Sequence, residues 1–193
     1  MPIAIWQLVV TFALVMIVAQ QKRKENIVEY LLYMWQVEDL IRANGLDIDK
    51  IRRTLINQYD QPDEVRSQIV QWYENLIEMM RSEGVTEHGH IQINKNVIID
   101  LTDLHLQLLK DPHETVYGSL YYNTLPSIVQ LRSKSGGAEM SEIETCFTAL
   151  YGYLLLKMQR KNITPETQDA VKQISTFLTY LAGKYKENEE KGI

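Results

Sequence analysis

The sequence has a single cysteine, Cys146. One thiol can form neither an internal disulfide nor a metal cage made only of cysteines, so the fold cannot depend on either. A chain of 193 residues is long enough to bury a full hydrophobic core without such staples. The scarcity of thiols also fits a reducing cytosol, where disulfides are rare.

Positive charge is scarce as well. The chain has 20 Lys and Arg residues against 25 Asp and Glu residues, a net charge of −5, and its basic residues form only short clusters such as Lys22-Arg23-Lys24. A protein that binds nucleic acid through the phosphate backbone needs a basic surface. We therefore expect no nucleic-acid partner.

The motifs of common enzymes are missing from the sequence. There is no phosphate-binding glycine-rich loop, no Gly-x-Ser-x-Gly elbow and no defensible pairing of Cys146 with a histidine. Asp100 and Asp103 share one helical face, but its other residues are polar, so the face reads as an exposed acidic strip. His88 and His90 lie in one loop, where a zinc site needs three or four ligands. The sequence thus assigns no catalytic residue, no metal ligand and no cofactor.

What the sequence does contain is apolar residues at helical spacing, about 100° per residue, along most of its length. We predict helices over about 22–43, 48–59, 62–82, 92–110, 112–133 and 142–161, and from 165 onward. Capping signals mark several starts: Asp47, Ser141 with Glu144, and Thr164 before Pro165. The predicted fold class is all-α, a single compact bundle of six or seven helices joined by short loops.

Three features of these helices lead to further predictions. Pro126 lacks the N–H group that a helix interior needs, so we expect a break there. The stretch FTALYGYLLLKM, residues 147–158, is apolar almost all round and should form the central buried helix. We expect residues 20–186 to form the helical domain and residues 187–193 a frayed polar tail.

Two polar residues fall on apolar helical faces. Glu38 lies between Ile27 and Leu31 on its helical wheel, and His105 lies within the apolar arc of residues 92–110. A buried carboxylate or imidazole must find a partner or shift its pKa. We predict a buried polar pair of Glu38 and His105, or pairing with tyrosine hydroxyls. The pair is either a structural contact in the core or an acid–base or ligand-binding pair in a cavity.

Tyrosine is abundant, with eleven residues, and is densest in the stretch YGSLYYNTLP. Tyrosine is favoured at protein contact surfaces because its ring is apolar and its hydroxyl can hydrogen-bond. We therefore name Tyr117, Tyr121 and Tyr122 as a candidate interaction surface.

The first residues raise a question of localisation. Residues 1–19 carry no charge, and such a stretch is just long enough to cross a bilayer as a helix. Either these residues form a membrane anchor with the remaining chain in the cytoplasm, or translation starts at Met16 and they are an upstream misassignment of the start. A secretory signal peptide is disfavoured because no Lys or Arg precedes the apolar run.

Several long strings resemble an uncharacterised family of small bacterial all-helical proteins, a domain of unknown function. They are KENIVEYLLYMWQVEDLIRA, WYENLIEMM, INKNVIIDLTDLHLQLLK, EIETCFTALYGYLLLK and FLTYLAGKYK. The resemblance runs from about Met16 to Lys186 and implies a cytosolic helical protein with no assigned activity, cofactor or partner. It also favours a start at Met16, because residues 1–15 depart from the family's pattern.

The sequence as a whole favours a soluble helical interaction or scaffold module, with a homodimer or another protein as its partner. One alternative is a small-molecule binder or metal-dependent hydrolase with a polar cavity near Glu38 and His105. The other is a membrane-tethered cytoplasmic regulator, which requires residues 1–19 to be a true anchor. No enzymatic reaction is assigned.

Overall fold

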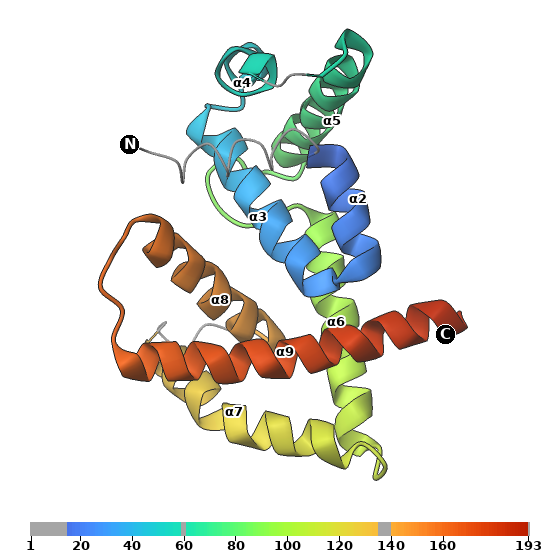
Figure 1. Cartoon of the computed structure of the whole chain (residues 1–193), viewed down its shortest axis with the longest axis vertical. Helices are drawn as coiled ribbons and strands as arrows, with labels where there is room; N and C mark the ends of the chain where they lie inside the picture. The colour runs from blue at the N-terminus through green and yellow to red at the C-terminus, as the bar shows by residue number, and fades with distance from the viewer. Residues whose placement is uncertain (1–14, 59–60, 135–139, 193) are drawn as a thin grey trace. The chain divides into compact units, whose positions relative to one another are not determined.

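The computed structural model describes residues 15–58, 61–134 and 140–192. Within those ranges the chain forms eight α-helices and one short 3₁₀ helix, and it forms no strand, so the all-α prediction is confirmed (Figure 1). The elements are α2 (Val15–Glu25), α3 (Ile27–Ala43), α4 (Ile48–Thr54), η1 (Ile56–Gln58), α5 (Asp63–Ser82), α6 (Gln92–Lys110), α7 (Thr115–Lys134), α8 (Glu142–Met158) and α9 (Pro165–Lys191).

The chain divides into two compact units. Among the described residues, unit 1 consists of residues 15–25, 33–58 and 61–95, and unit 2 consists of residues 26–32, 96–134 and 140–192. The boundaries between the units therefore fall between α2 and α3, inside α3 and inside α6. Residues 1–14, which make up most of the predicted N-terminal extension, lie outside the described residues.

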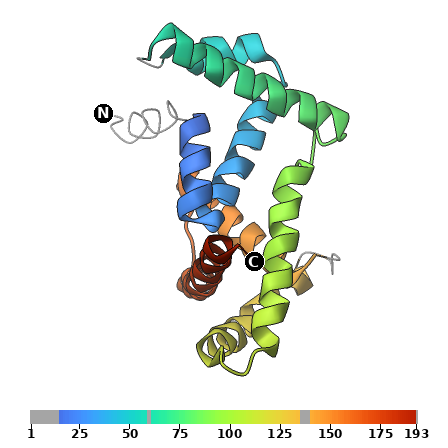
Figure 2. The ribbon, with the colours of Figure 1, turned by 90° about the vertical axis from the view of Figure 1, so that its right-hand side faces the viewer.

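Unit 1 is built around α5, whose apolar residues recur every three or four positions. Its buried side chains are Ile69, Tyr73, Leu76, Ile77 and Met80. Figure 2 shows α4 and η1, in cyan, running beside α5, in green. Asp47 caps α4 as predicted, because its side chain accepts hydrogen bonds from the backbone N–H groups of Asp49 and Lys50 at 2.9 and 3.1 Å.

In unit 2, α7, α8 and α9 pack on one another; they are yellow, orange and red in Figure 1. Their fully buried side chains include Tyr117, Ile128, Phe147, Phe177 and Leu181. The predicted caps are confirmed: Ser141 accepts from the N–H of Glu144 at 3.0 Å, and Thr164 accepts from the N–H of Thr167 at 3.3 Å. Each hydroxyl satisfies a donor that has no partner within its own helix.

Several helix boundaries differ from the prediction: α4 ends at Thr54 rather than near 59, α7 begins at Thr115 rather than near 112, and α8 ends at Met158 rather than near 161. Residues 22–43 are not one helix, because Asn26 separates α2 from α3: its side-chain oxygen accepts from the N–H groups of Val28 and Glu29 at 3.0 and 3.3 Å. Asparagine is a strong N-cap residue, so it favours a new start over continuation. The predicted frayed tail is also wrong, because α9 continues to Lys191 and ends at Gly192, whose φ is 69°.

The predictions for Pro126 and α8 were also wrong. α7 continues through Pro126, which lies on an exposed side of the helix, where water can bond the carbonyl that proline leaves without a donor. Only the first half of α8 is buried; residues 149–155 are half-buried, and Leu156 and Met158 are exposed. The helix thus carries more apolar surface than its neighbours cover.

Among the helices that the structure describes, none has the length and apolar character needed to cross a bilayer.

Candidate functional site

Glu38 is the most completely buried charged residue of α3, with no exposed side-chain surface. Its carboxylate accepts hydrogen bonds from the backbone N–H of Ile91 at 3.0 Å and from the side-chain amide of Asn94 at 2.8 Å. Its second oxygen lies 2.5 Å from Nδ1 of His90. All three partners lie at or just before the start of α6, where the helix dipole favours a negative charge.

The loop before α6 is held to α3 by two further side chains, Trp35 and Arg42. The ring of His90 stacks on Trp35, with centroids 4.0 Å apart and planes 9° from parallel. Arg42 donates to the backbone carbonyl of Val85 at 3.1 Å and to that of Gly89. Trp35, Glu38 and Arg42 therefore form a clamp on one side of α3, which holds the loop through Val85 and residues 89–91.

The buried imidazole of unit 2 is His105, which is 2% exposed. Its Nδ1 lies 2.6 Å from the hydroxyl of Tyr117, and its Nε2 lies 3.5 Å from a carboxylate oxygen of Glu142. A carboxylate only accepts hydrogen bonds, so the arrangement that satisfies both nitrogens places the proton on Nε2 and has the Tyr117 hydroxyl donate to Nδ1. The rings of Tyr117, Tyr121 and Phe177 surround the imidazole, with centroids 5.0–5.8 Å away.

Burial sets the protonation of this cluster. It lowers the pKa of His105, although the charge and hydrogen bond of Glu142 oppose the shift. It also raises the pKa of the Cys146 thiol to about 12, with a further contribution from the negative charge of Glu142. Burial first, and then a hydrogen bond with Glu142, raises the pKa of Tyr121 to about 12. Neutral pH therefore leaves the thiol and the phenol protonated, and a protonated thiol is a poor nucleophile.

Each of the two predicted residues has its partners within its own unit. Glu38 is hydrogen-bonded within unit 1 and His105 within unit 2, and each has its own partners. The alternative of a tyrosine hydroxyl is realised for His105, through Tyr117. Because both side chains are enclosed and bonded, their geometry suits a structural role rather than contact with a substrate.

The three tyrosines of the predicted interaction surface have different environments. Tyr117 is fully buried, Tyr121 is 9% exposed and Tyr122 is 67% exposed. Helical geometry explains the difference, because residues 117 and 121 are four apart and share the inner face, whereas residue 122 points away from it. Of the three tyrosines, only Tyr122 is available at the surface.

Tyr122 belongs to a continuous apolar strip that the sequence analysis did not identify. Val129 is 59% exposed, Pro126 is exposed and Leu125 is half-buried. Positions 122, 125, 126 and 129 follow the spacing i, i+3, i+4, i+7 and so share one face. We call these four residues the α7 stripe. The same spacing is legible in the sequence, but without the structure the outer face of α7 could not be told from its inner face.

Within residues 15–58, 61–134 and 140–192, no three His, Cys, Asp or Glu side chains are grouped so that they could hold a metal ion. Asp100 and Asp103, the acidic strip of the sequence analysis, are exposed on α6.

The clamp on the loop before α6 predicts a stability effect. Replacing Glu38 with Ala leaves buried donors without an acceptor, so the free energy of unfolding should fall by about 3–5 kcal/mol. Glu38→Gln keeps one acceptor oxygen for Ile91 and Asn94 and should cost less, about 1–3 kcal/mol. Urea denaturation followed by circular dichroism measures both. Glu78→Ala, at an exposed position of α5, is the control; an equal loss in that variant would contradict the clamp.

The lowered pKa of His105 predicts how stability depends on pH. Below its ordinary pKa of about 6.5, the unfolded chain binds a proton that the folded chain resists, so unfolding becomes easier as the pH falls. One such group contributes a slope of at most about 1.4 kcal/mol per pH unit. His105→Asn keeps an acceptor for Tyr117 and cannot titrate, so its stability should fall less between pH 7 and pH 5. His113→Asn, at an exposed position, is the matched control. If the free energy of unfolding fell equally with pH in the wild type and in His105→Asn, the lowered pKa of His105 would be refuted.

Comparison with known proteins places this arrangement in a family. No curated protein and no solved structure matches the chain. Residues 16–192 match a protein family described as a domain of unknown function. That match covers most of the 193 residues and agrees with the resemblance carried by the sequence strings. The chain therefore belongs to the DUF4924 family.

Proposed function

We propose that this protein is an interaction module that forms a homodimer through the α7 stripe. The observation that carries the proposal is the exposure of Tyr122 and Val129, 67% and 59%, on one uninterrupted apolar face. Burying such side chains is favourable, by about 25 cal/mol for each Å² of apolar surface removed from water. A second copy of the chain provides a surface of the same shape and chemistry, as a two-fold interface requires.

The charge of α7 supports a second copy as the partner. No charged residue lies between Glu114 and Arg132, so the face that carries the α7 stripe consists of apolar and neutral polar side chains. Two identical charged faces would repel each other, whereas two uncharged faces can meet without that cost. A strongly charged partner would find no complementary group on this face.

Comparison with the exposed apolar positions of α6 supports the choice of α7. On α6, Ile99 and Leu106 are 51% and 48% exposed and also lie seven residues apart. Between them on that helix lies the exposed carboxylate of Asp103, which would have to be desolvated in an interface. In the α7 stripe, the intervening positions are Leu125 and Pro126. The α7 stripe is therefore the better contact surface.

We place this module in the bacterial cytoplasm. The resemblance of its sequence strings to those of small bacterial proteins supports a bacterial origin. The single buried thiol, Cys146, fits a reducing compartment. Within such a dimer the buried groups around Glu38 and His105 shape the units, and no chemical reaction is assigned to them.

The proposal predicts a change of oligomeric state. Wild-type protein should sediment at twice the mass of one chain, and Val129→Lys should sediment as one chain, because the two-fold axis brings the introduced charges close together. We expect the dissociation constant to rise at least about thirtyfold, which corresponds to a hot-spot loss of about 2 kcal/mol. Analytical ultracentrifugation over a range of concentrations measures this.

Ile99→Lys is the matched control, because it places the same charge at a similarly exposed apolar position on α6. It should leave the dimer intact. A wild-type chain that stays monomeric at the highest concentration, or a Val129→Lys variant that dimerises like the wild type, would refute the proposal.

A further inference from the structure

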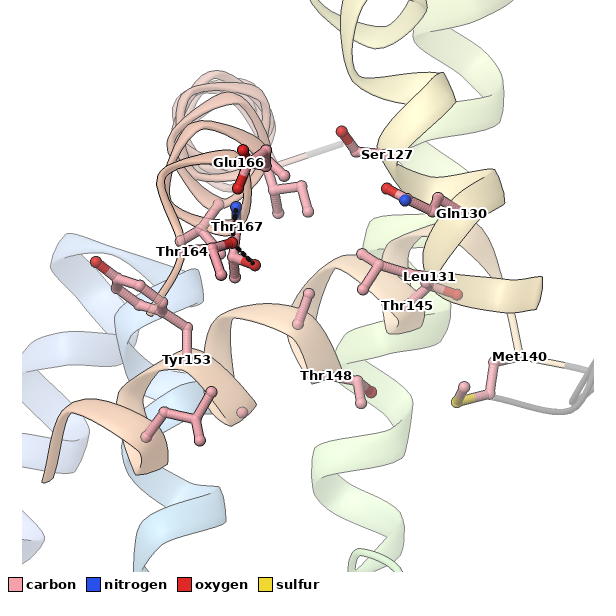
Figure 3. Close-up of a pocket in the computed structure, with 16 residues that line it drawn as sticks. Ser127, Gln130, Leu131, Met140, Thr145, Thr148, Tyr153, Thr164, Glu166 and Thr167 are labelled. Atoms are coloured by element: carbon pink, nitrogen blue, oxygen red, sulfur yellow. Dashed lines mark hydrogen bonds between the residues drawn. The ribbon is translucent and has the colours of Figure 1, made fainter. Parts of the chain in front are cut away.

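A cavity of about 430 Å³ lies between α7, α8 and α9 of unit 2 (Figure 3). Buried Ile174 and Thr145 are among its lining residues, and the half-buried side chains of Leu131 and Ala149 also line it. Its volume is within the range of about 300–1,000 Å³ that is typical of small-molecule sites. The half-buried and exposed part of α8, residues 149–158, borders this cavity, because Gly152 and Leu156 also line it.

Gly152 leaves space above the backbone of α8. A Cβ atom added at this position would meet no heavy atom within 4 Å. Glycine inside a helix lowers its stability by roughly 0.5–1 kcal/mol relative to alanine. A common reason for a glycine at such a position is the close approach of a neighbouring element. No described neighbour makes that approach here. The position is therefore open to an occupant from outside the chain.

The polar groups of the cavity are mainly hydroxyls. Figure 3 shows Ser127, Thr148, Thr164 and Thr167 around it, together with the phenol of Tyr153. Hydroxyl groups both donate and accept hydrogen bonds, so they suit neutral polar groups on a ligand. Since the remaining lining is largely aliphatic, most of the ligand has to be apolar.

Charge at the rim selects against anions. Glu166 is the only charged residue lining the cavity in the described part of the chain, and no Lys or Arg accompanies it there. A backbone N–H and the Thr164 hydroxyl bond its carboxylate and lower its pKa, so it is ionised at neutral pH. The N-terminus of α9 offers a positive dipole, but the Thr164 side chain already accepts from the N–H of Thr167.

We propose that the cavity between α7, α8 and α9 binds a compact apolar molecule that is uncharged and carries hydrogen-bonding groups. The residues of the α7 stripe do not line this cavity. Ligand binding and self-association are therefore independent proposals, and either can fail without the other.

Two related dyes test the proposal on the full chain. N-phenyl-1-naphthylamine is neutral and apolar and has one N–H group, and 8-anilinonaphthalene-1-sulfonate adds a sulfonate to the same skeleton. Fluorescence titration should show saturable binding of the neutral dye to one site per chain. The anionic dye should bind at least about tenfold more weakly, a difference of about 1.4 kcal/mol. Glu166→Gln should narrow that difference by improving the binding of the anionic dye.

Gly152→Leu places a side chain in the cavity and should weaken binding of the neutral dye at least about tenfold. Leucine favours helix more than glycine does, so the variant should fold, and circular dichroism checks that. Gly183→Leu is the matched control: it is an exposed helical glycine of α9 whose added Cβ also meets nothing within 4 Å. Its dye binding should equal that of the wild type.

Chemical-shift mapping on the wild-type protein gives a readout that needs no variant. Adding the neutral dye should shift the amide signals of α8 around Gly152 and those at the start of α9. The proposal is overturned if the shifts concentrate elsewhere, such as on the α7 stripe or in unit 1. It is overturned equally if no saturable binding occurs, or if Gly152→Leu binds the neutral dye as tightly as the wild type does.

Discussion

A carboxylate without contact to water has to be given donors, and this constraint organises the start of α6. Glu38 is fully buried, and the backbone of Ile91, the side chain of Asn94 and the ring of His90 all turn toward it. Leaving such a charge without partners would cost several kcal/mol. The loop before α6 therefore has little conformational freedom. Arg42 restricts the loop further, because it donates hydrogen bonds to two of the loop's backbone carbonyls.

In unit 2 the buried group that needs hydrogen-bond partners is an imidazole. His105 is kept neutral by burial, and the hydroxyl of Tyr117 and the carboxylate of Glu142 satisfy its two nitrogens. In both units the buried carboxylate or imidazole is thus bonded to neighbouring elements and holds helices in place. We locate the functions of the chain away from these buried groups, on the α7 stripe and in the cavity beside Gly152.

The helical period of the sequence was sufficient to predict α5 and α6 closely and to predict that Glu38 and His105 are buried, because each lies within an apolar arc. It could not predict their partners, since periodicity says which face is buried but not what covers it. The same limit made Tyr117 look like a surface residue, although it is the buried partner of His105. Two of the three boundaries between the units are also invisible to periodicity, because they fall inside α3 and inside α6.

Hydrogen exchange at the amide of Ile91 tests the role of Glu38 most directly. This amide lies just before the first residue of α6, where N–H groups have no acceptor within the helix and normally exchange quickly. Because Glu38 accepts its hydrogen bond in a buried site, we predict that it exchanges as slowly as the core amides of α5. Exchange as fast as that of the loop amides that precede it would contradict the account.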